Sequence, residues 1–394
     1  MLLTLDAKTS LPGDAGSATL VGRAWLPGGK HPGPSVVAIR AGQVFDITSA
    51  VPTMAELVNA SDPVKLARAE KGARKIGPVA ALLKNSVREG RDAKKPWLLA
   101  PIDLQAVKAA GVTFASSMLE RVIESKAKGD PRLQEALRTE LTREIGADLS
   151  KVKPGSAQAE KLKAALVARN LWSPYLEVGI GPYAEIFTKT APMASVGTGA
   201  EIGLHPESSW NNPEPEIVLA VNARGRTVGA TLGNDVNLRD FEGRSALLLG
   251  KAKDNNASSA IGPFIRLFDS SFSIADVRKS VVSLIVKGAD GFTMEGSSSM
   301  ALISRDPLDL VRHMMGKAHQ YPDGAVLFLG TMFAPTKDRG PKGSGFTHKI
   351  GDIVTIATPA LGALVNRVTT SDKAPPWTFG ASALMRNLAK RGMI

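Results

Sequence analysis

The stretch Glu214-Pro215-Glu216-Ile217-Val218-Leu219-Ala220-Val221 joins two carboxylates to a run of strand-forming residues. Side chains two positions apart on an extended segment project to the same face, so Glu214 and Glu216 are expected to share a side. A polar turn follows, and residues 227–232 are again strand-like, which together predicts a β-hairpin with a longer loop. Antiparallel register in that hairpin would place Asp235 beside Glu214.

The three acidic residues Glu214, Glu216 and Asp235 would supply only oxygen ligands. Mg²⁺, Mn²⁺ and Ca²⁺ prefer such a set, whereas Zn²⁺ usually recruits His or Cys, and neither lies nearby in the sequence. We therefore expect a magnesium site, with Mn²⁺ or Ca²⁺ as alternative ions. The spacing alone leaves a second interpretation equally open, in which Glu-Pro-Glu begins a solvated strand and Asp235 caps the turn that follows.

Motifs on both sides of this hairpin have the spacing of a known family. Glu214-x-Glu216, Asn234-Asp235-x-x-x-Arg239-Asp240 and a Lys253 before Gly262-Pro263 resemble the fumarylacetoacetate hydrolase superfamily. Further similar stretches, which extend the resemblance over most of the chain after about residue 100, are residues 185–189, 330–331, 351–354 and 366–368. The resemblance implies a strand-rich α+β fold, with a rolled β-sheet catalytic domain over residues 101–394 and a smaller N-terminal domain over residues 1–100.

Within that superfamily the chain most resembles the longer bacterial dehydratases of 2-keto-3-deoxy-D-pentonates, the acids formed from xylonate or arabinonate. The similar stretches are residues 110–114, 119–121, 210–213, 253–257, 319–324 and 376–380. The resemblance implies a metal-dependent hydro-lyase that converts its 2-keto acid substrate into 2,5-dioxopentanoate. The nearest alternative is an acylpyruvate-type hydrolase, which cleaves a C–C bond of a diketo acid on the same scaffold.

The resemblance also implies roles for individual residues. In the family's terms the metal ligands are Glu214, Glu216 and Asp235, the active-site lysine is Lys253, and the residue at the 2-oxo-acid end of the substrate is Thr331. The other expected substrate contacts are Arg239, Glu242, Ser117 and Ser259, with Glu242 standing where the founding hydrolases place a Gln. Lys253 acts as a base if burial and a nearby cation lower its pKa, or stays charged and pairs with an oxyanion of the substrate.

The segment Thr113–Arg121 lacks the His that the hydrolases commonly place there to activate water. Dehydration is therefore favoured, because C–C hydrolysis loses its usual base. Glu120 is our candidate for proton transfer at the leaving hydroxyl, since a desolvated carboxyl can stay protonated. Apolar residues recur at helical spacing over residues 114–126, so the alternative is that Glu120 is solvated on the polar face of an amphipathic helix.

Composition agrees with an enzyme of one large domain or two, because 43% of the 394 residues are hydrophobic and 22% are charged. With no cysteine, the chain has no disulfide, thiolate metal site or Cys nucleophile. The longest apolar stretch, residues 324–334, is far shorter than the roughly 20 residues that span a bilayer. The first residues lack a basic start and a long apolar region, and we expect a cytoplasmic protein that does not bind membranes.

The net charge of +12 raises the question of nucleic-acid binding, which is the remote alternative function. Basic residues are dispersed, with one denser cluster over residues 65–91, and aromatic residues make up only 5% of the chain. None is interleaved in that cluster for base stacking. We expect a small anionic substrate, attracted by the same positive field, and no nucleic-acid partner. The family resemblance implies a homodimer or homotetramer.

Short elements are expected in the N-terminal hundred residues. The strands are predicted at residues 18–26, 35–40 and 43–47, with a hairpin at Ala41-Gly42. A helix-prone tract covers residues 53–74, and residues 94–101 are expected to connect to the catalytic domain. Further helices are predicted at residues 130–145 and 156–170.

Overall fold

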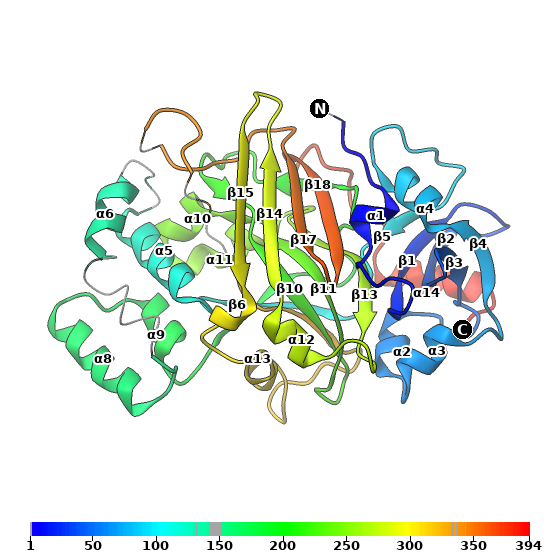
Figure 1. The fold of residues 1–394 in the computed structure, drawn as a ribbon, viewed down its shortest axis with the longest axis horizontal. Helices are drawn as coiled ribbons and strands as arrows, with labels where there is room; N and C mark the ends of the chain where they lie inside the picture. The colour runs from blue at the N-terminus through cyan, green and yellow to red at the C-terminus, as the bar shows by residue number, and fades with distance from the viewer. Residues whose placement is uncertain are drawn as a thin grey trace.

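Two β-sheets form the centre of the computed structural model (Figure 1). The structure describes residues 2–128, 130, 133–141, 143, 152–331, 335, 337–342 and 344–394. The larger described sheet has the strand order β4 (Arg74–Pro78), β3 (Gln43–Asp46), β2 (Gly33–Arg40), β1 (Leu20–Leu26), β13 (Ser259–Leu267), β11 (Thr227–Asp235), β10 (Pro215–Val221), β16 (Ala325–Phe328), β6 (Ala106–Gly111) and β7 (Glu185–Thr190). Strand β5 (Trp97–Leu99) pairs with β1 beside it.

The second sheet packs against the first. Its strand order is β15 (Thr293–Ser299), β14 (Val281–Lys287), β17 (Ile353–Thr358), β18 (Gly362–Thr370) and β8 (Glu201–Leu204). The short strands β9 (Asn211–Asn212) and β12 (Asn237–Leu238) pair with each other. Most pairs are antiparallel, but β16 pairs with β6 and β18 pairs with β8 in parallel.

Helices cover the two ends of this arrangement, as Figure 1 shows. Near the N-terminal strands and the chain ends lie α1 (Ala7–Ser10), α2 (Met54–Asn59), α3 (Pro63–Arg68), α4 (Val79–Ser86) and α14 (Ala381–Lys390). At the other end lie α5 (Ala115–Lys126), α6 (Gln134–Leu141), α8 (Ala157–Ala168), α9 (Pro174–Ile180), α10 (Arg239–Arg244) and α11 (Leu249–Lys253). Helices α12 (Ile274–Lys279) and α13 (Pro307–Met314) lie below the second sheet in this view.

The predicted hairpin is β10 and β11. Pro215 pairs with Asn234 and Glu216 with Gly233, and the amide of Asp235 donates to the carbonyl of Glu214 at 3.1 Å. Asp235 therefore lies beside Glu214, as the register predicts. The turn closes through the side chain of Asn222, which accepts hydrogen bonds from two backbone amides of the loop.

Strand β10 is buried on both faces, which explains its continuous apolar run. Ile217, Leu219 and Val221 face one core cluster, which they share with residues of β14, β17 and β18. Val218 and Ala220 face a second cluster that includes residues of β1, β2 and α2. The hairpin is therefore held between the second sheet and the N-terminal helices, and its start is fixed by packing on both sides.

The N-terminal strands agree with the prediction, and the helix-prone tract over residues 53–74 is helical in two separate pieces. Two short helices, α2 and α3, occupy this tract, and strand β4 begins at Arg74. The break occurs because Pro63 lacks an N–H and disfavours helical backbone before it, while the Asp62 side chain caps α3.

Further helices of the prediction can be compared in part. The helix predicted over residues 156–170 is confirmed as α8, with Ser156 as its cap. The helix expected over residues 130–145 is confirmed in part by α6, and several of its other residues lie outside the described residues. A boundary between domains at residue 100 stays a prediction, although β1 pairs directly with β13 of the expected catalytic domain.

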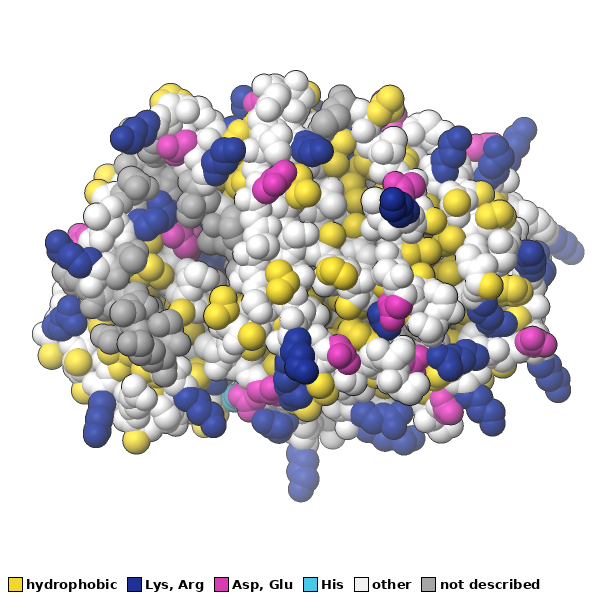
Figure 2. All heavy atoms as spheres, in the orientation of Figure 1, with side chains coloured by type: hydrophobic (Ala, Val, Ile, Leu, Met, Phe, Trp, Pro, Cys, Tyr) yellow, Lys and Arg dark blue, Asp and Glu magenta, His cyan; other side chains and the backbone are white. Residues whose placement is uncertain are grey.

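Two surface properties bear on the expected partners. No helix in the part of the chain that the structure describes is long and apolar enough to cross a membrane. Figure 2 shows Lys and Arg side chains spread over the visible face rather than gathered in one stripe. The expectation that the protein binds no nucleic acid stays a prediction.

Candidate metal centre

Three carboxylates meet where β10 begins and β11 ends. One oxygen from each of Glu214, Glu216 and Asp235 lies within 4.8 Å of the other two. The exposed fractions of these residues are 3%, 1% and 1%. The interpretation of Glu-Pro-Glu as a solvated strand start is therefore wrong, because the hairpin and the packing of β10 bury these carboxylates together.

The environment of Glu216 shows how strongly the cluster favours positive charge. Its Oε2 accepts a hydrogen bond of 2.7 Å from the amide of Gly330. Burial raises the pKa of Glu216 well above its ordinary value, and the charges of Asp235 and Glu214 raise it further. A divalent cation bound between the three carboxylates would offset both effects, so these residues fit a hard metal ion.

Lys253, at the end of α11, contacts the same cluster. Its Nζ lies 2.5 Å from Oε2 of Glu214 and 3.2 Å from Oδ2 of Asp235, and its side chain is 2% exposed. Burial acts to lower the pKa of Lys253, but Asp235 and Glu214 outweigh burial and hold it above its ordinary value. The two carboxylates therefore hold Lys253 in its charged form, and its role as a base or as a charged group stays a prediction.

A second buried lysine, Lys189 of β7, supports the first. Its Nζ lies 3.0 Å from Oδ1 of Asp235 and donates a hydrogen bond to the main-chain carbonyl of Lys253. Burial lowers the pKa of Lys189, although Asp235 acts against this. Lys189 therefore contacts both a candidate metal ligand and the backbone of Lys253.

Arg121 of α5 reaches the cluster from the other side. Its guanidinium lies 2.5 Å from Oε1 of Glu214, 2.6 Å from Oε2 of Glu124 and 2.8 Å from Oε2 of Glu242. Burial acts to lower the pKa of Arg121, but Glu124, Glu242 and Glu214 raise it well above its ordinary value. One cation thus joins three carboxylates from α5, α10 and the start of β10.

Arg239 and Glu242, two of the predicted substrate contacts, lie on α10 and join this network. Nε of Arg239 lies 3.2 Å from Oε1 of Glu124 and donates to Oδ1 of Asn212 at 2.8 Å. Nη1 of Arg239 is buried with no hydrogen-bond partner among the described residues. That donor is available to a substrate oxygen, which supports the predicted role of Arg239 without testing it.

Glu120 has its ion-pair partner outside the three carboxylates. It is 8% exposed and pairs with Arg138 of α6, with Nε 2.8 Å from its Oε1. The alternative that Glu120 is solvated on the polar face of its helix is therefore wrong. Its neighbour Arg121 is the residue that reaches the cluster, because successive residues of a helix point about 100° apart. A catalytic role for Glu120 stays a prediction.

Of the remaining predicted substrate contacts, Ser259 and Thr331 neighbour residues of the cluster, whereas Ser117 makes a local contact in α5. Ser259 pairs in register with Asp235, and its hydroxyl contacts that of Ser195 at 2.9 Å. Thr331 directly follows Gly330, the donor to Glu216. The hydroxyl of Ser117 instead donates to the carbonyl of Phe114 at the start of α5, which is a local capping contact.

Glu185, at the start of β7, is a site residue that the sequence reasoning missed. Burial raises its pKa to about 7, the charge of Glu242 adds to this, and Arg121 and Lys253 act in the opposite sense. Gly111 makes room for it, because a Cβ at that position would lie 1.9 Å from Oε2 of Glu185. Arg121 and Lys189 were also missed. All three are charged residues inside stretches that resemble the family, residues 119–121 and 185–189, and this could have identified them.

A balance of charges summarises the centre. Among the described residues the carboxylates are Glu124, Glu185, Glu214, Glu216, Asp235 and Glu242, and the cations are Arg121, Lys189, Arg239 and Lys253. Fully ionised, the centre would carry two more negative than positive charges. A single divalent cation neutralises that excess.

Comparisons with known proteins show the family of the chain. The model of the fumarylacetoacetate (FAA) hydrolase C-terminal family matches residues 168–369, which include the whole hairpin, Lys189 and Lys253. The chain belongs to the fumarylacetoacetate hydrolase family. The family model begins after α5, so Arg121 and Glu124 come from the part of the chain that it does not cover.

Two curated relatives match about half of the chain. The 2-dehydro-3-deoxy-D-arabinonate dehydratase of Saccharolobus solfataricus is 29% identical over 184 residues, which are 47% of this chain and 58% of the relative. A probable 2-keto-3-deoxyxylonate dehydratase of Haloferax volcanii is 29% identical over 196 residues, which are 50% of this chain and 64% of the relative. The matched part of this chain thus spans less than two thirds of either relative.

Solved structures confirm the predicted fold. A 2-keto-3-deoxy-D-arabinonate dehydratase complexed with magnesium and 2,5-dioxopentanoate is 19% identical and has a TM-score of 0.60, with 89% of this chain and 99% of that chain covered. The fumarylacetoacetate hydrolase of Exiguobacterium antarcticum is 16% identical and has a TM-score of 0.52, with 90% and 100% covered. The strand-rich α+β architecture predicted from the family resemblance is therefore correct.

Proposed function

We propose that this protein is a hydro-lyase that dehydrates a 2-keto-3-deoxy-D-pentonate of the xylonate or arabinonate type to 2,5-dioxopentanoate. The observation that carries the proposal is the contact of Lys253 with Glu214 and Asp235 inside a buried cluster of three carboxylates. The two dehydratases to which the chain is similar support the choice of reaction.

Glu214, Glu216 and Asp235 would hold Mg²⁺, with Mn²⁺ or Ca²⁺ as alternatives, because they offer only oxygen ligands in a buried group. A divalent ion there would act as a Lewis acid on the carboxylate and ketone of the 2-keto acid and make the neighbouring C3 protons more acidic. Side chains of the protein would stabilise charge on the substrate and transfer protons.

The charged Lys253 would stabilise negative charge that develops on the 2-oxo group. A carboxyl must also move protons, since the reaction removes a proton from C3 and releases the C4 hydroxyl as water. Of the two candidates we favour Glu185, because burial raises its pKa and would let it accept and release a proton closer to neutral pH. Glu120 would then act through its ion pair with Arg138, by holding α6 against α5.

Proton shifts along the resulting conjugated system convert the C5 carbinol into the aldehyde, so the balance of the reaction is the loss of one water. Arg239 and Thr331 are proposed to contact the substrate, Arg239 through its unpaired buried Nη1 and Thr331 through its place beside Gly330. Glu242 would act through Arg121. Ser259 is proposed as a contact beside Asp235, and Ser117 as a contact only if it leaves its capping bond.

Hydrolysis of a C–C bond on the same scaffold is the second candidate. It requires a base that activates water, usually a His on the segment that covers the site. In the described residues 113–124, which lie against the carboxylates, the charged groups are Glu120, Arg121 and Glu124, without a His. This composition favours dehydration over hydrolysis.

Product analysis tests the proposal. We expect the purified protein with Mg²⁺ to convert 2-keto-3-deoxy-D-xylonate or 2-keto-3-deoxy-D-arabinonate into 2,5-dioxopentanoate, measured by mass spectrometry and by coupled oxidation of the aldehyde. Activity should disappear with EDTA and return with Mg²⁺. Pyruvate and a second fragment from an acylpyruvate, with no turnover of either keto-deoxy acid, would instead establish the hydrolase.

The partners and place of action are part of the same proposal. We propose a small 2-keto acid as the only substrate class, a homodimer or homotetramer as the assembly, and the cytoplasm as the location. Light scattering coupled to gel filtration measures the assembly directly. A salt-sensitive gel shift with DNA or RNA at physiological ionic strength would revive the nucleic-acid alternative.

A further inference from the structure

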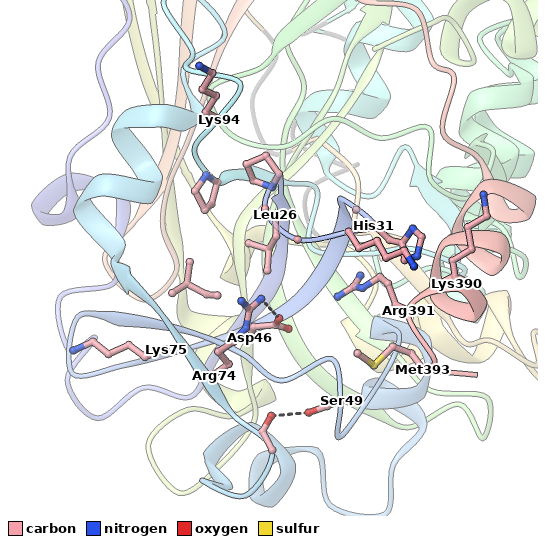
Figure 3. Close-up of a pocket in the computed structure, with 18 residues that line it drawn as sticks. Leu26, His31, Asp46, Ser49, Arg74, Lys75, Lys94, Lys390, Arg391 and Met393 are labelled. Carbon is pink, nitrogen blue, oxygen red and sulfur yellow. Dashed lines mark hydrogen bonds and ion pairs between the residues drawn. The ribbon is translucent and has the colours of Figure 1, made fainter.

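A cavity of about 790 Å³ lies far from the metal centre in the fold, between the N-terminal strands and the C-terminal helix (Figure 3). Its walls come from the loop between β1 and β2, the ends of β3 and β4, the segment before β5, and the end of α14. In Figure 1 these elements lie at the opposite end of the molecule from α5, α10 and α11. None of the lining residues belongs to the metal centre.

The lining is strongly cationic. The Lys and Arg residues among the lining are Lys30, Arg74, Lys75, Lys94, Lys390 and Arg391. Asp46 is the only acidic residue among those that line the cavity, and both of its oxygens are engaged. Its Oδ1 accepts from the hydroxyl of Thr48 at 2.6 Å, and its Oδ2 accepts from Arg74 at 3.0 Å. The lining therefore keeps a large excess of positive charge.

Arg391 carries one of these charges in a fixed position. Its Nη1 donates to the carbonyl of Pro34 at 2.7 Å and its Nη2 to the hydroxyl of Ser35 at 2.8 Å. In the described part of the chain no carboxylate forms an ion pair with this half-buried guanidinium, and Asp46 pairs with Arg74 instead. Burial lowers the pKa of Arg391, with Asp46 acting to raise it and Arg74 to lower it. The group is therefore held by neutral acceptors, and Asp46, the carboxylate that acts on it, is already paired with Arg74.

The position of Arg391 in the cavity is consistent with a ligand rather than with solvation alone. In the view of Figure 3 the Asp46–Arg74 pair lies between Lys75 on one side and Arg391 with His31 on the other, and Lys94 stands at the upper end. Cations on separate walls of a concave surface raise the local potential together, more than dispersed surface charges do. Gly28 and Gly29 in the lining leave backbone free of side chains on one wall.

We propose that this cavity binds a phosphorylated small molecule that carries at least two negative charges. A guanidinium held by neutral acceptors, together with several lysines, is the combination that recognises phosphate oxygens. The volume admits a ligand of nucleotide size, because small-molecule sites usually measure about 300 to 1,000 Å³. The substrate proposed for the metal centre is a monoanion without phosphate, so this site would serve a different ligand.

The test uses tripolyphosphate as the probe, with the intact protein and no added divalent cation. Isothermal titration calorimetry at about 150 mM NaCl should give a dissociation constant below about 1 mM, since screening at this salt suppresses attraction that comes only from dispersed charges. Sulfate at matched ionic strength should bind at least tenfold more weakly. Arg391→Gln should raise the dissociation constant for tripolyphosphate at least tenfold.

Three control variants keep the inference falsifiable. Arg40→Gln removes an arginine of β2 that is also held by backbone carbonyls, those of Ala67 and Ala69, but lies outside the cavity, and it should leave binding unchanged. Glu216→Gln should also leave binding unchanged, because it alters only the metal centre. Lys287→Gln with Lys317→Gln removes two exposed lysines elsewhere and should have no more than a twofold effect.

A second cavity variant tests the inference even if Arg391→Gln does not fold. Lys75→Gln with Lys94→Gln removes two exposed lysines of the lining and should weaken tripolyphosphate binding at least fivefold. Absence of binding at 150 mM salt, equal effects of the two double-lysine variants, or loss of binding in Glu216→Gln would each overturn the inference.

Discussion

Nη2 of Arg121 lies 2.5 Å from Oε1 of Glu214, although the two residues are 93 positions apart in the chain. The pair joins α5 to the start of β10, and both side chains are buried. Because Arg121 also contacts Glu124 and Glu242, the position of α5 depends on the charge state of the cluster. A helix outside the matched family region is thereby tied to the carboxylates that would hold the metal.

Removing this cation should destabilise the protein. Arg121→Gln leaves three buried carboxylates without their shared partner, and we expect the free energy of unfolding to fall by about 3 to 5 kcal/mol. Mg²⁺ should restore part of the loss, because it compensates Glu214. Urea unfolding with and without Mg²⁺ measures both effects. Lys126→Gln, an exposed change on the same helix, is the matched control, and an equal loss in that variant would contradict the explanation.

Glu216→Gln should abolish metal binding and lower kcat/KM by at least about 100-fold, because one of three carboxylate ligands becomes a neutral amide. The metal-free variant should be at least as stable as the natural protein, since burial and neighbouring carboxylates disfavour a charge at this position. Titration with Mn²⁺ followed by electron paramagnetic resonance measures the first effect. If the variant bound Mn²⁺ with the same dissociation constant as the natural protein, Glu216 would not be a metal ligand.

Lys253→Ala should reduce kcat by at least about 100-fold while the metal still binds, because the lysine is proposed to stabilise charge on the substrate. Lys251→Ala is the matched control, since Lys251 lies on the same short helix but is exposed. Steady-state kinetics at saturating Mg²⁺ separates the two variants. If both retained turnover, the role of Lys253 would have to be abandoned.

The ionisation of Glu185 should be visible in both stability and activity. Its pKa of about 7 in the folded protein lies above the ordinary value of 4.5, so the folded state binds the proton more tightly than the unfolded chain. The metal-free protein should therefore lose stability relative to Glu185→Gln as the pH rises from about 4.5 to 7, with a full difference of about 3 kcal/mol above pH 7, because one pKa unit corresponds to about 1.4 kcal/mol.

Denaturant unfolding across this pH range measures the difference, and Glu295→Gln, on an exposed position of β15, should show none. In kinetic measurements with Mg²⁺ the natural protein should show a pH-dependent change in kcat/KM that is absent in Glu185→Gln, with its inflection below pH 7 because a bound cation favours the ionised carboxylate. A variant with the same inflection as the natural protein would exclude Glu185 as the titrating group.

The hairpin could be predicted from the sequence because its signals are local. Glu214 and Glu216 are two apart on a strand, and the turn length fixes the partner of Glu214 as Asp235. Burial of the three carboxylates could not be predicted, since a Glu-Pro-Glu segment is typical of a solvated strand start as well. The packing of both faces of β10, which involves residues distant in sequence, decides between the two.

The supporting charges were missed for a related reason. Glu120 and Arg121 are neighbours in a helix, and the sequence does not show which of them faces β10. Lys189 and Glu185 lie on β7, which is separated from β10 in the large sheet by β6 and β16. Only the assembled sheet brings Lys189 to the backbone of Lys253. A buried ionised group looks like an ordinary surface residue until its partners are known.

Strand β13 pairs with β11 beside the carboxylates, where Ser259 is opposite Asp235, and with β1 at its other end, where Arg266 is opposite Leu20. A shortened chain that begins at residue 101 would leave part of β13 as a bare edge, which is a template for aggregation. Chimeras that exchange the first hundred residues between relatives must therefore preserve the pairing of β1 with β13. The N-terminal strands and the hairpin that carries the carboxylates are parts of one continuous sheet.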